Sequence, residues 1–166
     1  LEKDRFVATR DNLKIRIERG DAADLSRFAD ESFDLIFHPC SNCFMENILV
    51  IWRECFRVLR RGGALLSGFN NPIVYIFDQF AEECGVLEVR HKLPYSDLKD
   101  LSEAERKLMI KKKEALEFSH SLETQIGGQI EAGFLIAGFY EDWWHDEARL
   151  LNKYAPSFIA TKAIKP

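Results

Sequence analysis

The hydrophobic and polar positions along the chain predict five strands. Residues 14–18 alternate polar and apolar side chains, which is the period of a strand with one buried face. Residues 32–37 end in a nearly continuous apolar run, which is typical of a strand buried on both faces of an α/β sheet. Similar apolar runs predict three further strands, over 64–69, 134–140 and 158–164.

Apolar residues at helical spacing predict five helices. The clearest covers 46–61, with Gly62-Gly63 directly after it to provide the left-handed residue that commonly ends a helix. In the helix expected over 102–113, Ser102 and Glu105 have the spacing of a capping box. The other three helices are predicted over 1–13, 71–85 and 122–132.

The order of these elements predicts an α/β fold with a mostly parallel sheet. No long helical period separates the last two strands, so we expect them to form an antiparallel pair that closes the sheet. Residues 86–120 offer little apolar surface and predict a lid-like insertion over the sheet's edge. The whole of 1–166 is expected to form one domain, because its length suits a single core.

Composition narrows the class of protein. A hydrophobic fraction of 46% excludes intrinsic disorder, and no apolar run is long enough to cross a bilayer. No secretory leader can be read, and four cysteines suit a reducing cytosol better than a disulfide scaffold, so we expect a cytoplasmic protein. A net charge of -4 argues against nucleic acid as the main partner, and no membrane partner is expected.

Four segments, in this order, resemble motifs of the class I S-adenosylmethionine-dependent methyltransferases that act on small molecules. Each is weak alone, but together they span most of the chain. Gly20-Asp21-Ala22 resembles the adenine-site turn, 33–37 the fourth strand, 54–63 the helix with a Gly-Gly turn, and 131–134 the Ala-Gly-Phe entry to the sixth strand.

The resemblance implies a Rossmann-like sheet and methyl transfer from S-adenosylmethionine to a small molecule. It implies that the Asp21 carboxylate accepts a hydrogen bond from the adenine amino group and that the Ala22 amide approaches a ring nitrogen. Phe37 and His38 would line the same cofactor pocket. The alternative for Asp21 is a solvated turn acid, since Gly-Asp is common in turns.

The family also opens with a strand, a glycine-rich loop and a second strand that ends in an acid. No Gly-x-Gly pattern precedes the first predicted helix, so we expect these N-terminal strands to be missing and the cofactor site to be incomplete. The chain by itself is then expected to be inactive. The strand at 14–18 would lack its neighbour, so we expect it to shift beside 33–37 or to pair in a swapped homodimer.

His38 is the candidate catalytic residue, because it follows a predicted parallel strand at the end where open α/β sheets bind ligands. An imidazole with a pKa of about 6.5 can act as a general base near neutrality. The alternative is that His38 only lines the cofactor pocket. His38-Pro39-Cys40-Ser41 departs from the Asn/Asp-Pro-Pro-aromatic motif of relatives that methylate planar nitrogens, so nucleic-acid and protein-glutamine substrates lose support.

Three further residues are candidates for the walls of a substrate pocket, namely Tyr95, His120 and Tyr140, with packing as the alternative for the aromatic side chains. Cys40 and Cys43 form a Cys-x-x-Cys, but no thioredoxin-like order of elements surrounds them and no second ligand pair follows. We therefore expect neither a redox centre nor a metal site.

Two other functions fit the same pattern less well. A non-catalytic methyltransferase-like scaffold, acting as a partner domain, would share every structural feature of the enzyme. A nucleotide-dependent oxidoreductase would share the alternation of strands and helices, but the antiparallel finish with Ala132-Gly133-Phe134 argues against it.

Overall fold

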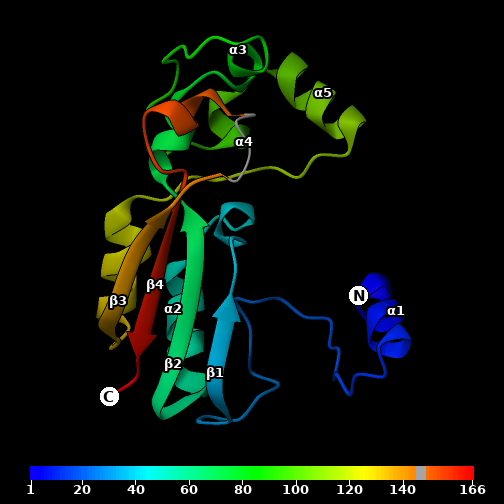
Figure 1. The fold of residues 1–166 in the computed structure, drawn as a ribbon, viewed down its shortest axis with the longest axis vertical. Coiled ribbons are helices and arrows are strands. Elements are labelled where there is room, and N and C mark those ends of the chain that lie inside the picture. The colour runs from blue at the N-terminus through cyan, green and yellow to red at the C-terminus, as the bar shows by residue number, and fades with distance from the viewer. Residues whose placement is uncertain (145–148) are drawn as a thin grey trace.

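The computed structural model describes residues 1–144 and 149–166, and its centre is a four-stranded sheet in the order β1-β2-β4-β3 (Figure 1). The parallel pair is β1 with β2, while β4 is antiparallel to both β2 and β3. The predicted α/β fold and its antiparallel C-terminal strand pair are confirmed, and in the described sheet one of the three strand pairings is parallel. The strands are β1 (Phe33–His38), β2 (Leu59–Asn70), β3 (Leu135–Asp142) and β4 (Phe158–Ile164).

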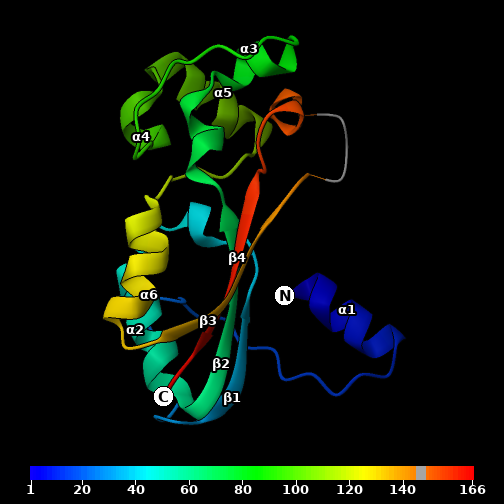
Figure 2. The ribbon, with the colours of Figure 1, turned by 60° about the vertical axis from the view of Figure 1, so that its left-hand side comes forward.

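Helices cover one face of this sheet, as Figure 2 shows for α2 (Leu49–Val58) and α6 (Gly128–Glu131). A π-helical turn, η3 (Glu123–Gly127), leads into α6. The apolar stripe predicted for the clearest helix is buried here, since Trp52 is 0% exposed. The core consists of this stripe and the strand residues beneath it: Ile48, Ile51, Trp52, Cys55, Leu59, Leu65, Phe134 and Ala163.

Two glycines allow α6 and the turn after it to approach α2 closely. A Cβ at Gly128 would lie 2.6 Å from Leu49 Cδ2 and 2.9 Å from Trp52 Cδ1, so a larger residue would require these side chains to shift. Gly133 has a φ of +109°, and a Cβ there would lie 2.8 Å from the Phe56 ring. Glycine at position 133 thus suits the turn from α6 into β3.

A group of short helices lies beyond the carboxyl ends of β1 and β2 (Figure 1). The capping box predicted at Ser102 and Glu105 is present at the start of α5. The helix predicted over 71–85 is divided into η2 and α3, because Phe77 pairs with Val89 in a β-bridge between them. The group comprises η2 (Pro72–Ile76), α3 (Gln79–Glu83), α4 (Asp97–Asp100), α5 (Glu103–Lys112) and η4 (Leu150–Lys153).

The strand predicted over 14–18 is not formed, and its expected shift beside β1 is not found. Within the described residues β1 pairs with β2 alone, and Ile15 is 54% exposed. A strand requires hydrogen-bonding neighbours, and alternating side chains alone do not supply them. Helix α1 (Glu2–Arg10) and the segment after it stand apart from the sheet in both views (Figures 1 and 2).

The segment regains contact with the core just before β1. The Arg57 guanidinium on α2 donates to the carbonyl oxygens of Leu25 and Phe28 at 2.9 and 3.0 Å, and it also binds the carboxylates of Glu54 and Asp30. One arginine therefore ties residues 25–30 to the helix.

Among the residues that the structure describes, no helix is both long enough and apolar enough to span a membrane.

Candidate functional site

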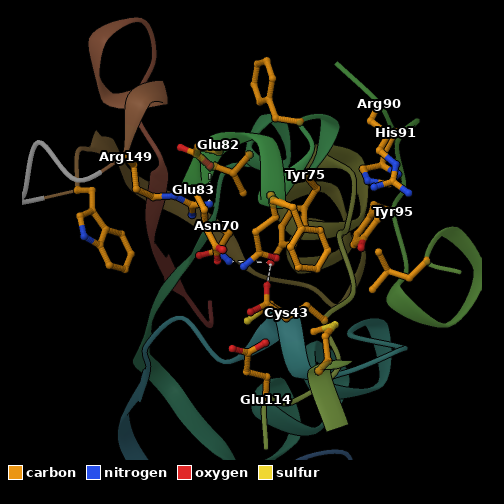
Figure 3. A pocket seen from close by; sticks show the side chains of 18 of the residues that line it. Cys43, Asn70, Tyr75, Glu82, Glu83, Arg90, His91, Tyr95, Glu114 and Arg149 are labelled. Atoms are coloured by element: carbon orange, nitrogen blue, oxygen red, sulfur yellow. Dashed lines mark hydrogen bonds and ion pairs between the residues drawn. The ribbon is translucent and has the colours of Figure 1, made fainter. Parts of the chain in front are cut away.

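A cavity of about 370 Å³ lies at the carboxyl ends of β1 and β2, beneath η2, α3 and α5 (Figure 3). Open α/β sheets bind ligands at this end of their strands, so the cavity is the candidate functional site. The loop after β1 contributes Cys40 and Cys43, and β2 contributes Asn70. The helical group contributes Tyr75 and Glu82, the segment before α4 contributes Tyr95, and the segment after α5 contributes Glu117.

A chain of hydrogen bonds crosses the wall of this cavity (Figure 3). The Asn70 amide donates to Tyr75 Oη at 2.8 Å, and Tyr75 Oη donates to Glu117 Oε2 at 2.7 Å. Burial raises the pKa of the Tyr75 hydroxyl, which keeps it protonated as a donor. Burial also raises the pKa of the Glu117 carboxyl, opposed by the hydrogen bond from Tyr75.

His38 occupies the end of β1, as predicted, next to the cavity wall. Its Nε2 lies 2.5 Å from Asn42 Oδ1, and its ring packs edgewise on Trp52 with centroids 5.8 Å apart. The Asn42 amide nitrogen donates to Gln125 Oε1 at 2.7 Å, so Asn42 Oδ1 accepts the proton of His38 Nε2. The neutral ring then carries its lone pair on Nδ1.

Burial lowers the pKa of His38, while the hydrogen bond to Asn42 opposes that shift. The imidazole is therefore neutral near pH 7, which is the form that can accept a proton. His38 itself is not among the residues that line the cavity, whereas its neighbour Cys40 is.

The residues predicted to bind adenine do not line the 370 Å³ cavity. Asp21 is exposed in a turn, where its Oδ1 accepts the Ala23 amide at 2.9 Å, and Ala22 packs against the core cluster. The Phe37 side chain is 71% exposed on β1. The structure thus leaves a carboxylate and an aromatic ring open to a ligand.

The three predicted substrate-pocket residues have different surroundings. Tyr95 lines the 370 Å³ cavity, and with His120 it also lines a neighbouring cavity of about 290 Å³. His120 Nε2 lies 2.8 Å from the Met45 carbonyl and 3.1 Å from that of Asn42, so it fastens the loop after β1. Tyr140 is 62% exposed on β3 and lines neither cavity.

The Cys-x-x-Cys after β1 does not have the properties of a redox centre. Burial raises the pKa of the Cys40 thiol and raises that of Cys43 to about 11. A reactive thiol requires the opposite shift. All four cysteines are free, and the described residues contain no cluster of side chains suited to a metal ion.

Several cavity residues were not predicted from the sequence, namely Asn70, Tyr75, Glu82 and Glu117. Asn70 could have been found, because it directly follows a predicted parallel strand. Tyr75 and Glu117 are 42 residues apart, and no local pattern relates them.

The sequence of this chain is similar to those of known methyltransferases. Residues 1–67 match the family described as "Methyltransferase domain". The uncharacterized methyltransferase YbaJ of Bacillus subtilis (strain 168) is 50% identical over 165 residues, which are 99% of this chain and 64% of that protein. The chain therefore spans less than two thirds of that relative's length.

Solved structures share the fold at low sequence identity. An S-adenosylmethionine-dependent methyltransferase from Mesorhizobium loti superposes with a TM-score of 0.65 at 16% identity, over 98% of this chain and 76% of that one. The [4+2]-cyclase SpnF superposes with a TM-score of 0.63 at 15% identity, over 98% of this chain and 60% of that one. The fold therefore does not define the reaction. The chain is thus similar in sequence to methyltransferases, and it shares its fold with solved S-adenosylmethionine-dependent methyltransferases.

Proposed function

We propose that the protein transfers a methyl group from S-adenosylmethionine to a small molecule bound in the 370 Å³ cavity. The observation that carries this proposal is the position of that cavity, at the carboxyl ends of two parallel strands, where Cys40, two residues after His38, lines it. A cavity of this size holds a small ligand and excludes a folded macromolecule. All four cysteines are free, which agrees with a cytoplasmic location.

The exposed groups around β1 fit the cofactor in chemical type. The exposed Asp21 carboxylate accepts the Ala23 amide with Oδ1, which leaves its second oxygen for a ligand, and the exposed Phe37 ring offers an apolar face for a purine. When bound, S-adenosylmethionine supplies an electrophilic methyl group on a sulfonium sulfur. Asp21, Ala22, Phe37 and His38 are the residues of this chain that would hold it.

The residues of the cavity then orient the acceptor and exclude water. Tyr75 and Asn70 present a fixed donor–acceptor chain at the strand ends, and Tyr95 closes one wall. Neutral His38 is the candidate acceptor for a proton released by the substrate, with Nδ1 as the atom that receives it. Its fixed orientation comes from Asn42.

The Asp21→Ala variant tests the cofactor site. Removing the carboxylate should weaken S-adenosylhomocysteine binding by about 1–3 kcal/mol, because the adenine amino group loses its acceptor. The measurement is isothermal titration calorimetry on the full-length protein. Asp24→Ala is the matched control, since Asp24 lies in the same loop and its carboxylate bonds only locally, to the Ser26 amide at 3.0 Å.

Unchanged affinity in Asp21→Ala would remove this residue from the site. A complete lack of S-adenosylhomocysteine binding by the unaltered protein would contradict the proposed reaction. That second result would favour the non-catalytic scaffold.

Residues 86–120 are proposed to act as a lid over the acceptor. Helix α5 has Met109 as its one buried residue, so its backbone should open more readily than the strands. We expect amide hydrogen exchange in 93–120 to be faster than at Leu35 or Leu65, and fastest in α5. Exchange as slow as in the strands would show that this segment is part of the core.

A further inference from the structure

The wall of the 370 Å³ cavity carries an excess of negative charge. Four carboxylates line it (Glu82, Glu83, Glu114 and Glu117) against three cations (Arg90, Lys112 and Arg149). Each of the three cations already contacts a carboxylate. Arg90 binds Asp78 at 2.7 Å and Glu105 at 2.8 Å, Arg149 binds Glu82 at 3.0 Å, and Lys112 lies 3.9 Å from Glu114.

Glu117 has no ion-pair partner within 4 Å among the described residues, and its carboxylate is held by the neutral Tyr75 hydroxyl. Glu82 is also incompletely satisfied. Its side chain is 9% exposed, and while Oε2 accepts from Arg149, Oε1 is buried and accepts no hydrogen bond from the residues that the structure describes. A buried carboxylate oxygen without a donor is costly, so this atom is suited to receive a donor from a ligand.

Aromatic rings form a further part of the wall, with Tyr75 and Tyr95 visible in Figure 3. Tyr75 and Tyr95 are stacked with centroids 5.7 Å apart, and Trp144 and Phe158 are stacked at 5.1 Å. All four residues line the cavity. The faces of such rings attract cations, and they also accommodate an apolar carbon skeleton.

We propose that this cavity binds a small organic amine, with its ammonium group donating to the carboxylates of Glu117 and Glu82. Two carboxylates with free acceptor capacity favour a cation that brings several donors, and the aromatic walls favour a compact apolar skeleton attached to it. A ligand with a carboxylate or phosphate group would be repelled by the negative charge of Glu117, because no cation among the described residues pairs with that side chain. The inference rests on the proposed function only in treating this amine as the substrate.

The test compares ligands that share a skeleton and differ in charge. Tyramine is titrated against 3-(4-hydroxyphenyl)propionate, and hexylamine against hexanoate, by calorimetry on the full-length protein. At least one amine should bind about tenfold or more tightly than its carboxylate partner, the scale of one charge-assisted hydrogen bond. The Glu117→Gln and Glu82→Gln variants should each weaken that amine by a similar factor.

Glu103→Gln is the matched control, because Glu103 is an exposed carboxylate on α5 that pairs with Lys107 outside the cavity. It should leave amine affinity unchanged. The ligand comparison on the unaltered protein decides the question even where a variant fails to fold. If neither amine binds better than its carboxylate partner, or if both cavity variants bind amine as the control does, the inference is overturned.

A parallel titration with S-adenosylhomocysteine separates this inference from the proposed function. Cofactor binding without selectivity for amines would overturn the substrate class and leave methyl transfer standing. Selective amine binding without cofactor binding would contradict methyl transfer and leave the amine site standing.

Discussion

The Trp52→Ala variant is expected to lose about 3–5 kcal/mol in its free energy of unfolding. The Trp52 side chain is 0% exposed at the centre of the core, where α2 packs on the sheet. Its indole Nε1 donates to the Thr124 carbonyl at 3.1 Å, so alanine would leave both a cavity and a carbonyl without its donor. Urea denaturation followed by circular dichroism measures this loss.

Trp143→Ala is the matched control for this change. Trp143 is 49% exposed at the end of the sheet, and its removal should change stability by no more than about 0.5 kcal/mol. Similar losses in the two variants would show that Trp52 does not hold α2 against the sheet.

The Asn42→Ala variant should have the second largest effect, a loss of about 1–3 kcal/mol in stability. Asn42 is 1% exposed and binds both His38 and Gln125, which would lose their partners together. The variant should also lower the pKa of His38 further, because the hydrogen bond that His38 donates to Asn42 is the contribution that raises it. Denaturation and an NMR titration of the His38 ring measure the two effects.

The direction of the pH dependence follows from the same shift. Since burial lowers the pKa of His38 in the folded protein, the unfolded chain takes up a proton first as the pH falls. Stability should therefore decrease as the pH drops below about 6.5, the value for an exposed histidine, and Asn42→Ala should extend this decrease to lower pH.

Ser41→Ala serves as the control for Asn42→Ala. The Ser41 hydroxyl lies 3.4 Å from His38 Nε2, too far for a strong bond, so its loss should leave the pKa of His38 unchanged. A His38 pKa that does not move in Asn42→Ala would show that this asparagine does not fix the imidazole.

The elements that were predicted correctly are mostly those whose regularly spaced apolar residues are buried in the core. Helix α2 and strand β4 bury the apolar residues of their patterns, whereas the burial expected on both faces of β1 is wrong, since Leu35 and Phe37 are 56% and 71% exposed. The antiparallel β3–β4 pair was expected because no long helical period separates the two strands in the sequence. The segment at 14–18 has an equally clear alternation. It forms no strand because pairing depends on a neighbour that no local pattern describes.

The cavity shows the same division between local and long-range information. Tyr95 and the end of β1 were predicted from their place in the order of elements. Glu117 was not, because its role depends on Tyr75, which meets it across 42 residues and a chain reversal. Likewise, the exposed position of Tyr140 is set by the face of β3 that lies away from the helices.

The strand order has a consequence for how the chain folds as it is synthesised. Strand β4 lies between β2 and β3, although it follows both of them along the chain, and it provides the sheet pairing of β3 among the described residues. Until residues 158–164 have left the ribosome, β2 and β3 each present an unpaired edge. A nascent or shortened chain that stops before residue 158 is therefore expected to aggregate through those edges, and to depend on chaperones until β4 inserts.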